Sequence, residues 1–154
     1  MARGVTHERA ECPVARAVDV IGDRWSLLIV RDAFDGITRF SDFQRNLGLA
    51  KNILASRLRD LTAAGILEAV PAAEGSAYRK YTLTEKGREL FSLIVAIRQW
   101  GEEYLFEDQE PHSVLLDTEH ERPLRRLEVV DSTGRALTSS GTFVRKVSHG
   151  DARS

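Results

Sequence analysis

The fold is decided by residues 39–65, whose sequence is RFSDFQRNLGLAKNILASRLRDLTAAG. Ser41 is a good helix cap and Gly48 a good helix terminator, so we expect a short helix over 41–46 and then a turn. A second helix follows, and Gly65 suits its end. The apolar residues of this second helix have the spacing of one buried helix face. They are Ile53, Leu54, Leu58 and Leu61.

Two runs of β-forming residues come after these helices. They are ILEAVP at 66–71 and YRKYTLT at 78–84, and the loop between them, 73–76, is small and polar. Two helices joined by a turn and followed by a hairpin predict a winged helix-turn-helix. Such a domain usually binds duplex DNA.

Further helices are expected on both sides of this segment. Proline at the first position favours a helix over 13–21, and an aspartate can cap the next helix, over 24–34. Thr84 can cap a long helix over 85–106. This last helix is apolar on more than one side, which is typical of a helix that meets a partner.

The composition changes after residue 111. Residues 124–130 and 142–147 are rich in Val, Leu, Phe and Thr, and 131–134 is a turn signal, so we expect two strands.

The fold class is therefore α+β and mainly helical: a winged helix-turn-helix with dimerising N- and C-terminal helices and a small C-terminal β appendage. The expected parts are a flexible arm at 1–11, the DNA-binding and dimerisation domain at 12–110, a β-rich appendage at 111–147 and a disordered tail at 148–154.

The charges of the 154 residues are unevenly distributed. The net charge is −1, but residues 39–88 carry nine basic and five acidic side chains, and residues 89–119 carry one basic and eight acidic. The positive excess therefore lies on the expected helix-turn-helix, where it would favour double-stranded DNA as a partner. The alternative is that these charges only solvate helix surfaces.

Other classes of protein lack support in the sequence. No run of about 18 apolar residues is present, which predicts no membrane span, and a single cysteine suits a reducing cytoplasm. Neither a phosphate-binding loop nor a nucleophile elbow occurs, and the four histidines lack metal-ligand spacing. We expect a cytoplasmic protein that is not an enzyme and has no cofactor or metal.

Candidate DNA contacts lie on the second helix of the motif, on the hairpin and at two helix starts. Asn pairs with adenine and Arg with guanine, whereas Lys and Ser more often touch phosphate. Arg39 has the alternative of pairing with Asp35 or Asp42, and Arg24 that of pairing with Asp23 or Asp19. The full candidate set is Arg24, Arg39, Lys51, Asn52, Ser56, Arg57, Arg79 and Lys80.

The ordered set of motifs resembles the HxlR family of bacterial winged-helix transcriptional regulators. The residues that carry the resemblance are Cys12-Pro13, Ile21-Gly22-Asp23-Arg24-Trp25, Arg39-Phe40, Leu54, Leu58, Leu61, Gly65, Tyr81-Thr82-Leu83-Thr84, Gly87 and Trp100. The resemblance implies a homodimer that binds a palindromic operator, acts as a repressor and responds to oxidants or electrophiles through an N-terminal cysteine. Ala50 departs from the serine that often opens the second helix in this family, and the wing lacks a common proline.

Two further sets follow from these expectations. The dimer interface should include Val14, Val18, Leu93, Ile97, Trp100 and Tyr104. Cys12 precedes Pro13 and so should cap the first helix, where the helix dipole favours a reactive thiolate, or it is a buried apolar residue. Alternatives for the whole chain are a protein-interaction module and a regulator that senses a small-molecule inducer without thiol chemistry.

Overall fold

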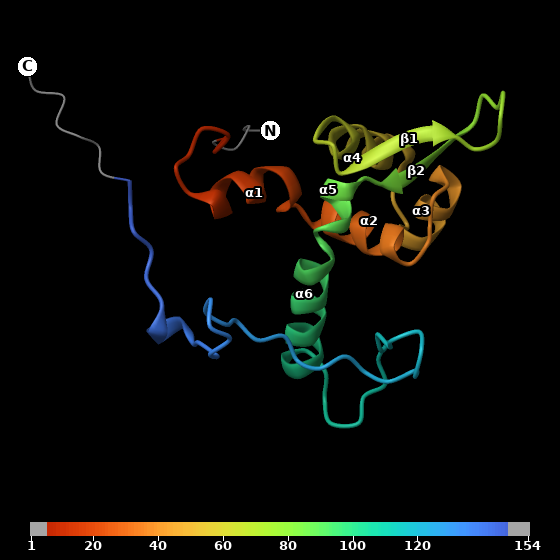
Figure 1. Ribbon diagram of the computed structural model, residues 1–154. Helices are drawn as coiled ribbons and strands as arrows, with labels where there is room; N and C mark the ends of the chain where they lie inside the picture. The colour runs from red at the N-terminus through yellow and green to blue at the C-terminus, as the bar shows by residue number, and fades with distance from the viewer. Residues whose placement is uncertain (1–5, 148–154) are drawn as a thin grey trace, which may run out of the picture. The chain divides into compact units, whose positions relative to one another are not determined.

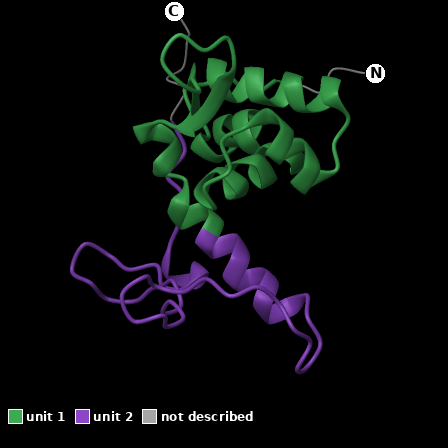
Figure 2. Cartoon of the chain, turned by 90° about the vertical axis from the view of Figure 1, so that its right-hand side faces the viewer, with its two compact units in different colours: residues 1–94 green, residues 95–154 purple. Residues whose placement is uncertain are grey.

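The computed structural model describes residues 6–147. The chain divides into two compact units, Met1–Ile94 and Val95–Ser154 (Figure 2). The division lies inside a helix, not at residue 111 where the composition changes. The expected disordered tail at 148–154 lies outside the described residues, as do residues 1–5 of the expected arm.

The first unit contains the predicted helices (Figure 1). They are α1 (Pro13–Ile21), α2 (Arg24–Phe34), α3 (Phe40–Leu47) and α4 (Lys51–Ala63). The Asp23 side chain accepts hydrogen bonds from the amides of Trp25 and Ser26, which confirms it as the cap of α2. The cap of α3 is Arg39 and not Ser41, because the Arg39 carbonyl accepts hydrogen bonds from two amides of the first turn.

The predicted hairpin is confirmed as two antiparallel strands. They are β1 (Leu67–Pro71) and β2 (Arg79–Leu83), and Leu67 is opposite Leu83. The Tyr81 amide donates to the Thr38 carbonyl at 2.7 Å, so the residues before α3 join the edge of β2. This bond fixes the hairpin against the helix-turn-helix.

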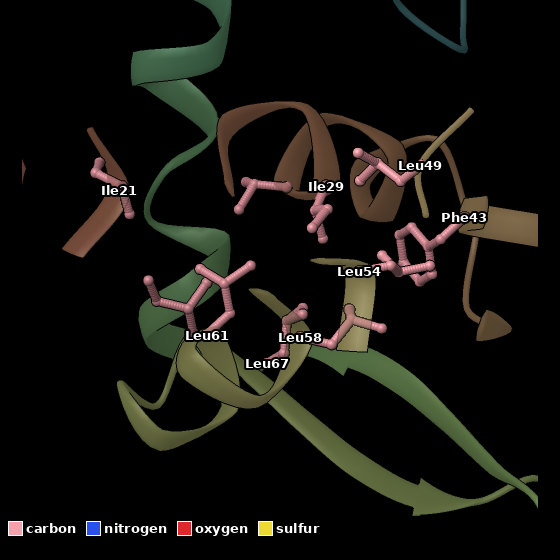
Figure 3. Close-up of a cluster of buried hydrophobic side chains, with 10 residues drawn as sticks. Ile21, Ile29, Phe43, Leu49, Leu54, Leu58, Leu61 and Leu67 are labelled. Atoms are coloured by element: carbon pink, nitrogen blue, oxygen red, sulfur yellow. The ribbon is translucent and has the colours of Figure 1, made fainter. Parts of the chain in front are cut away.

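The core of the first unit forms where α2, α3, α4 and the hairpin meet. Leu54, Leu58 and Leu61 point from α4 into this core and are completely buried or nearly so (Figure 3). Ile53, which was expected on the same face, is exposed instead, because it precedes Leu54 by one residue and so points about 100° away from it. Phe43 of α3 and Ile29 of α2 are also completely buried. The apolar face of α4 therefore positions its opposite face toward solvent.

One carboxylate is buried in this core region. Asp32 of α2 has no exposed surface, and one of its oxygens accepts hydrogen bonds from the Arg31 guanidinium at 2.7 and 2.9 Å. Its other oxygen accepts a hydrogen bond from the Asn46 side-chain amide at 2.8 Å. Asp32 thus ties the end of α3 to α2, a contact that sequence spacing does not reveal.

The expected single helix over 85–106 is wrong, because the structure has two helices there: α5 (Glu85–Arg88) and α6 (Phe91–Tyr104). Thr84 caps α5 as predicted. A Cβ on Gly87 would lie 2.1 Å from the Ile66 carbonyl oxygen, so α5 packs directly on the backbone that leads into β1.

The two predicted strands of the tail are also absent. Within residues 6–147, the tail has only isolated bridges, Leu116 to Pro123 and Val130 to Ala136, and a short 3₁₀ helix, η1 (Ser139–Gly141). The predicted turn at 131–134 is confirmed, because the Gly134 amide donates to the Asp131 carbonyl at 3.0 Å.

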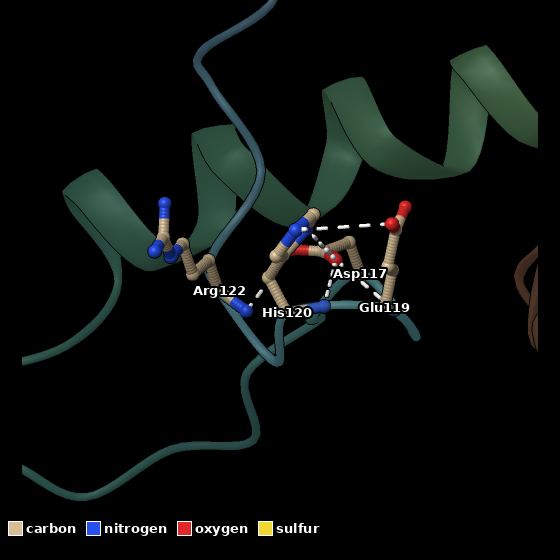
Figure 4. Close-up of polar contacts among 4 residues, drawn as sticks. All are labelled: Asp117, Glu119, His120 and Arg122. Carbon is tan, nitrogen blue, oxygen red and sulfur yellow. Dashed lines mark hydrogen bonds and ion pairs between the residues drawn. The ribbon is translucent and has the colours of Figure 1, made fainter.

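Two aspartates organise the turns of the tail. The Asp117 carboxylate accepts backbone hydrogen bonds from Glu119, His120 and Arg122, and the bond from His120 is the main reason that its pKa is lowered (Figure 4). The pKa of Asp131 is lowered to about 2, above all by the Thr133 hydroxyl. These carboxylates stabilise loops within the second unit.

No helix in the range 6–147 has both the length and the apolar character to cross a membrane. The same range holds no group of three or more His, Cys, Asp or Glu side chains that could bind a metal ion. His149 lies outside the described residues.

Candidate nucleic-acid interface

The solvent face of α4 carries a polar stripe. Asn52, Ser56 and Arg59 are four and three residues apart, so they lie on one helix face, opposite the buried leucines. Asn52 and Arg59 are exposed, and Arg59 makes no ion pair with any residue in 6–147. The stripe therefore combines an amide that can pair with adenine and a guanidinium that can pair with guanine.

Arg57 has a different environment from the one expected for a base-reading residue. Its guanidinium lies 3.7 Å from Asp23, the cap of α2, and 3.4 Å from Asp60 of α4. Its side chain is half-buried beside these carboxylates. Arg57 therefore links α4 to the start of α2, and Arg59 occupies the outward position.

The first turn of α4 lacks a side-chain cap, as the sequence predicts. Ala50 is the cap residue and provides no side-chain hydrogen bond, so the backbone amides of the first turn lack a side-chain acceptor from that residue. Lys51 is the first residue of the helix and is exposed. This turn presents one positive charge and helix amides, which is a suitable environment for a phosphate group.

A groove lies between the start of α3 and the wing. Its volume is about 700 Å³, and Arg39 and Arg79 both line it. Ser41, Ser76 and Tyr78 also line it. Phe40, Ala72 and Ala73 make the rest of the lining apolar, so the groove is mainly apolar and carries two arginines that can pair with an anion.

The other basic candidates are near these elements. Lys80 is half-buried, and its backbone forms an isolated antiparallel β-bridge with that of Arg39. Arg79 is exposed, and its guanidinium donates a hydrogen bond to the Ala69 carbonyl at 3.2 Å. Neither Asp35 nor Asp42 pairs with Arg39 within the described part of the chain.

The remaining basic candidate lies at the start of α2. Arg24 is exposed, and its guanidinium lies over the Trp25 ring at 4.6 Å from the ring centre. It forms no ion pair with Asp19 or Asp23 among residues 6–147. Arg24 therefore keeps its charge available on the surface.

The expected interface residues lie on two exposed apolar stripes. Val14 and Val18 are one turn apart on α1, and both are exposed. On α6, Leu93, Ile97, Trp100 and Tyr104 recur every three or four residues and are all exposed. The Trp100 and Tyr104 rings pack 5.5 Å apart. Such apolar stripes are typical of a contact surface.

Cys12 is at the predicted position. It is the cap residue of α1 and has no side-chain hydrogen bond to the helix. Its side chain is exposed, so the alternative of a buried apolar cysteine is wrong. The thiol is accessible to reagents in solution.

The sequence contained a signal for Arg59. Its distance of seven residues from Asn52 and three from Ser56 places it on their face, although the candidate set omitted it. The role of Arg57 could not be found this way, because its partner Asp23 lies on another helix.

Known proteins are similar to this chain over different lengths. The uncharacterized HTH-type transcriptional regulator Rv3095 of Mycobacterium tuberculosis (strain ATCC 25618 / H37Rv) is 46% identical over 98 residues, which are 64% of this chain and 62% of that protein. The chain thus spans less than two thirds of the length of this relative.

Solved structures extend the similarity to the tail. The crystal structure of PA1607, provisionally named a transcription factor, is 53% identical with a TM-score of 0.88, and the match covers 93% of this chain and 100% of that one. The redox regulator HypR in its reduced form is 32% identical with a TM-score of 0.55, covering 60% of this chain and 92% of that one.

The match to a protein family covers the helix-turn-helix, the wing and α6. Residues 20–109 fit the pattern of the HxlR-like helix-turn-helix family, and this range is more than half of the chain. The chain belongs to the HxlR-like helix-turn-helix family.

Proposed function

We propose that this protein is a sequence-specific DNA-binding transcriptional regulator. The observation that carries the proposal is the outward stripe of Asn52, Ser56 and Arg59 on a helix whose opposite face is buried in the core. A helix of this kind enters the major groove in helix-turn-helix proteins, where base edges can be distinguished.

Each basic element has its own role in this proposal. Asn52 and Arg59 contact base edges, and Lys51 contacts phosphate at the start of α4. Arg39 and Arg79, on the two sides of the groove, contact the DNA backbone next to the major groove. Phosphate contacts of this kind set the position of the protein on DNA and carry no sequence information.

Arg57 acts on DNA binding only by positioning α4. Its ion pairs with Asp23 and Asp60 join the recognition helix to α2. The Arg57→Ala variant is therefore expected to lose stability, with no change in which base pairs are preferred.

A series of variants tests the proposal on a duplex that the wild-type protein selects from a random-sequence library. Arg59→Ala should weaken binding by about 1–3 kcal/mol and relax specificity at one position. Arg79→Ala should weaken binding to all DNA sequences similarly, and it should reduce the slope of log K against log salt concentration by about one. Arg135→Ala is the control, because this exposed arginine pairs with Asp131 in the second unit. Equal losses of DNA affinity in the Arg59→Ala and Arg135→Ala variants would refute the assignment of α4 as the helix that reads the DNA sequence.

The protein acts as a homodimer in this proposal. The exposed stripes on α1 and α6 would be buried in a two-fold symmetric pair. Two recognition helices about 34 Å apart would then read a palindromic operator. Bound there, a dimer that covers promoter DNA would repress transcription. Ile97→Glu combined with Trp100→Glu should give a monomer in sedimentation experiments and weaker DNA binding, whereas a wild-type monomer at micromolar concentration would refute the dimer.

Cys12 is the proposed input to this regulator. Support comes from its exposed position at the start of α1, next to the stripe of Val14 and Val18, and from the likeness to the redox regulator HypR. With one cysteine in the chain, an oxidant can convert Cys12 into an intersubunit disulfide or into a mixed disulfide with a small thiol, and an electrophile can form an adduct with it. DNA affinity should change on mild oxidation in the wild type and stay constant in Cys12→Ser. If oxidation changes the DNA affinity of the wild type and of Cys12→Ser equally, Cys12 is not the residue that senses the oxidant.

A further inference from the structure

The second unit has two apolar surfaces that its own residues leave uncovered. One is the end of the α6 stripe, where Trp100 and Tyr104 are 56% and 60% exposed. The opposite face of α6 is covered, since Val95 is buried. The other surface is residues 142–147, where Phe143 and Val144 are 83% and 77% exposed.

Residues 142–147, which we name the terminal segment, have the composition of a strand without a strand partner. The sequence TFVRKV contains four β-branched or aromatic residues. No β-bridge in the described part of the chain includes these residues, and no backbone hydrogen bond there is donated or accepted by residues 143–147. Figure 1 shows this stretch as an extended trace after η1. An exposed extended segment of this kind binds well to another surface.

The charges around these two surfaces are opposite. Glu107 and Asp108 lie three and four residues after the last residue of α6, are exposed and form no ion pair among residues 6–147. Arg145 and Lys146 of the terminal segment are likewise exposed and lack ion pairs within that range. The end of α6 is thus apolar and acidic, and the terminal segment is apolar and basic.

The two acidic side chains within α6 are already paired. Glu102 lies 3.9 Å from Arg98, and Glu103 pairs with Arg126. The unpaired acidic groups next to the end of α6 and the unpaired basic groups of the terminal segment are therefore complementary in sign as well as in apolar character.

We propose that the terminal segment of one copy binds along the end of α6 of a second copy. Phe143 and Val144 would cover Trp100 and Tyr104 of the second copy, and Arg145 and Lys146 would face its Glu107 and Asp108. Two-fold symmetry makes the exchange reciprocal, so both uncovered surfaces are buried twice in one dimer. The start of the α6 stripe, at Leu93 and Ile97, stays available for contact between the two helices. This inference rests on the proposed homodimer and assigns the tail a role in it.

Charge reversal tests the exchange, because it separates contacts between copies from contacts within a copy. One variant carries Arg145→Glu and Lys146→Glu, and the other carries Glu107→Lys and Asp108→Lys. In a dimer of either variant, like charges face each other. In a dimer that contains one copy of each variant, opposite charges face each other at both contacts: the two new glutamates face the two new lysines, and the native arginine and lysine face the native acidic residues. Sedimentation at low ionic strength should show each variant alone dimerising about tenfold more weakly than wild type. An equimolar mixture should recover the wild-type dimer affinity.

The outcomes distinguish this inference from the homodimer itself. If the wild-type protein dimerises but the mixture is no tighter than the separate variants, the segment does not bind a second copy. If both variants dimerise like wild type, the charges have no part in the interface and the inference is overturned. A wild-type monomer would overturn the proposed homodimer and this inference together. Circular dichroism of the two variants checks that the surface substitutions leave the fold intact.

Discussion

Replacement of Asp32 by alanine should destabilise the protein by about 2–3 kcal/mol. The carboxylate accepts hydrogen bonds from Arg31 at 2.7 and 2.9 Å and from Asn46 at 2.8 Å. A hydrogen bond to a charged group contributes about 1.5–3 kcal/mol. The full sum is not expected, because the Arg31 side chain is 36% exposed and Asn46 is exposed, so water can replace the lost acceptor. Removing a buried charge also returns some free energy.

Thermal and urea unfolding measure this change. For a chain of this size, 2–3 kcal/mol corresponds to a decrease in Tm of roughly 4–12 °C. Asp42→Ala is the matched control, since Asp42 is 41% exposed and pairs with Arg45 at 3.3 Å on the surface of α3. That variant should lose less than about 1 kcal/mol. Equal losses in the two variants would refute the view that Asp32 joins α2 to α3.

Two other predictions concern the stability of glycine variants and the pH dependence of the turn at Asp131. Gly87→Ala should cost more than about 2 kcal/mol, because its Cβ would lie 2.1 Å from the Ile66 carbonyl oxygen. By contrast, the new Cβ of Gly101→Ala would have no atom within 4 Å apart from its chain neighbours and the backbone of its own helix, so this change should stabilise α6 by up to about 1 kcal/mol in thermal unfolding. Asp131 has a pKa lowered to about 2, mainly by the Thr133 hydroxyl, so the turn is stabilised fully above about pH 4 and loses this contribution as the pH falls toward 2. An NMR titration of the Asp131 carboxyl with a midpoint near the ordinary value of 3.8 would contradict this assignment.

The helix-turn-helix was predictable because its signals are local. The leucine spacing of α4 places one face in the core whatever the neighbours are, and Gly48 has the positive φ of 64° that ends α3. The hairpin was predictable because β1 and β2 are joined by a short loop and pair with each other. In each case the residues that determine the element are close together in the sequence.

The rest depended on contacts between distant residues. The break between α5 and α6 lies close to Gly87, whose approach to Ile66 is a long-range contact that helix periodicity does not report. Residues 142–147 have strand propensity, but a strand also needs a partner, and the described chain offers none. Arg59 was not among the candidate DNA contacts, although its spacing from Asn52 and Ser56 in the sequence could have selected it. The pairing of Arg57 with Asp23 could be found only in the structure.

The most direct test of DNA reading by α4 is the affinity of the wild-type protein for two duplexes of equal length over a range of salt concentrations. One duplex is selected by the protein from a random library, and the other has the same bases in scrambled order. We expect the selected duplex to bind at least about 10³-fold more tightly, and both affinities to fall as salt rises. Equal affinity for the two duplexes, or no binding to either at low salt, would contradict the proposal that Asn52, Ser56 and Arg59 read a DNA sequence.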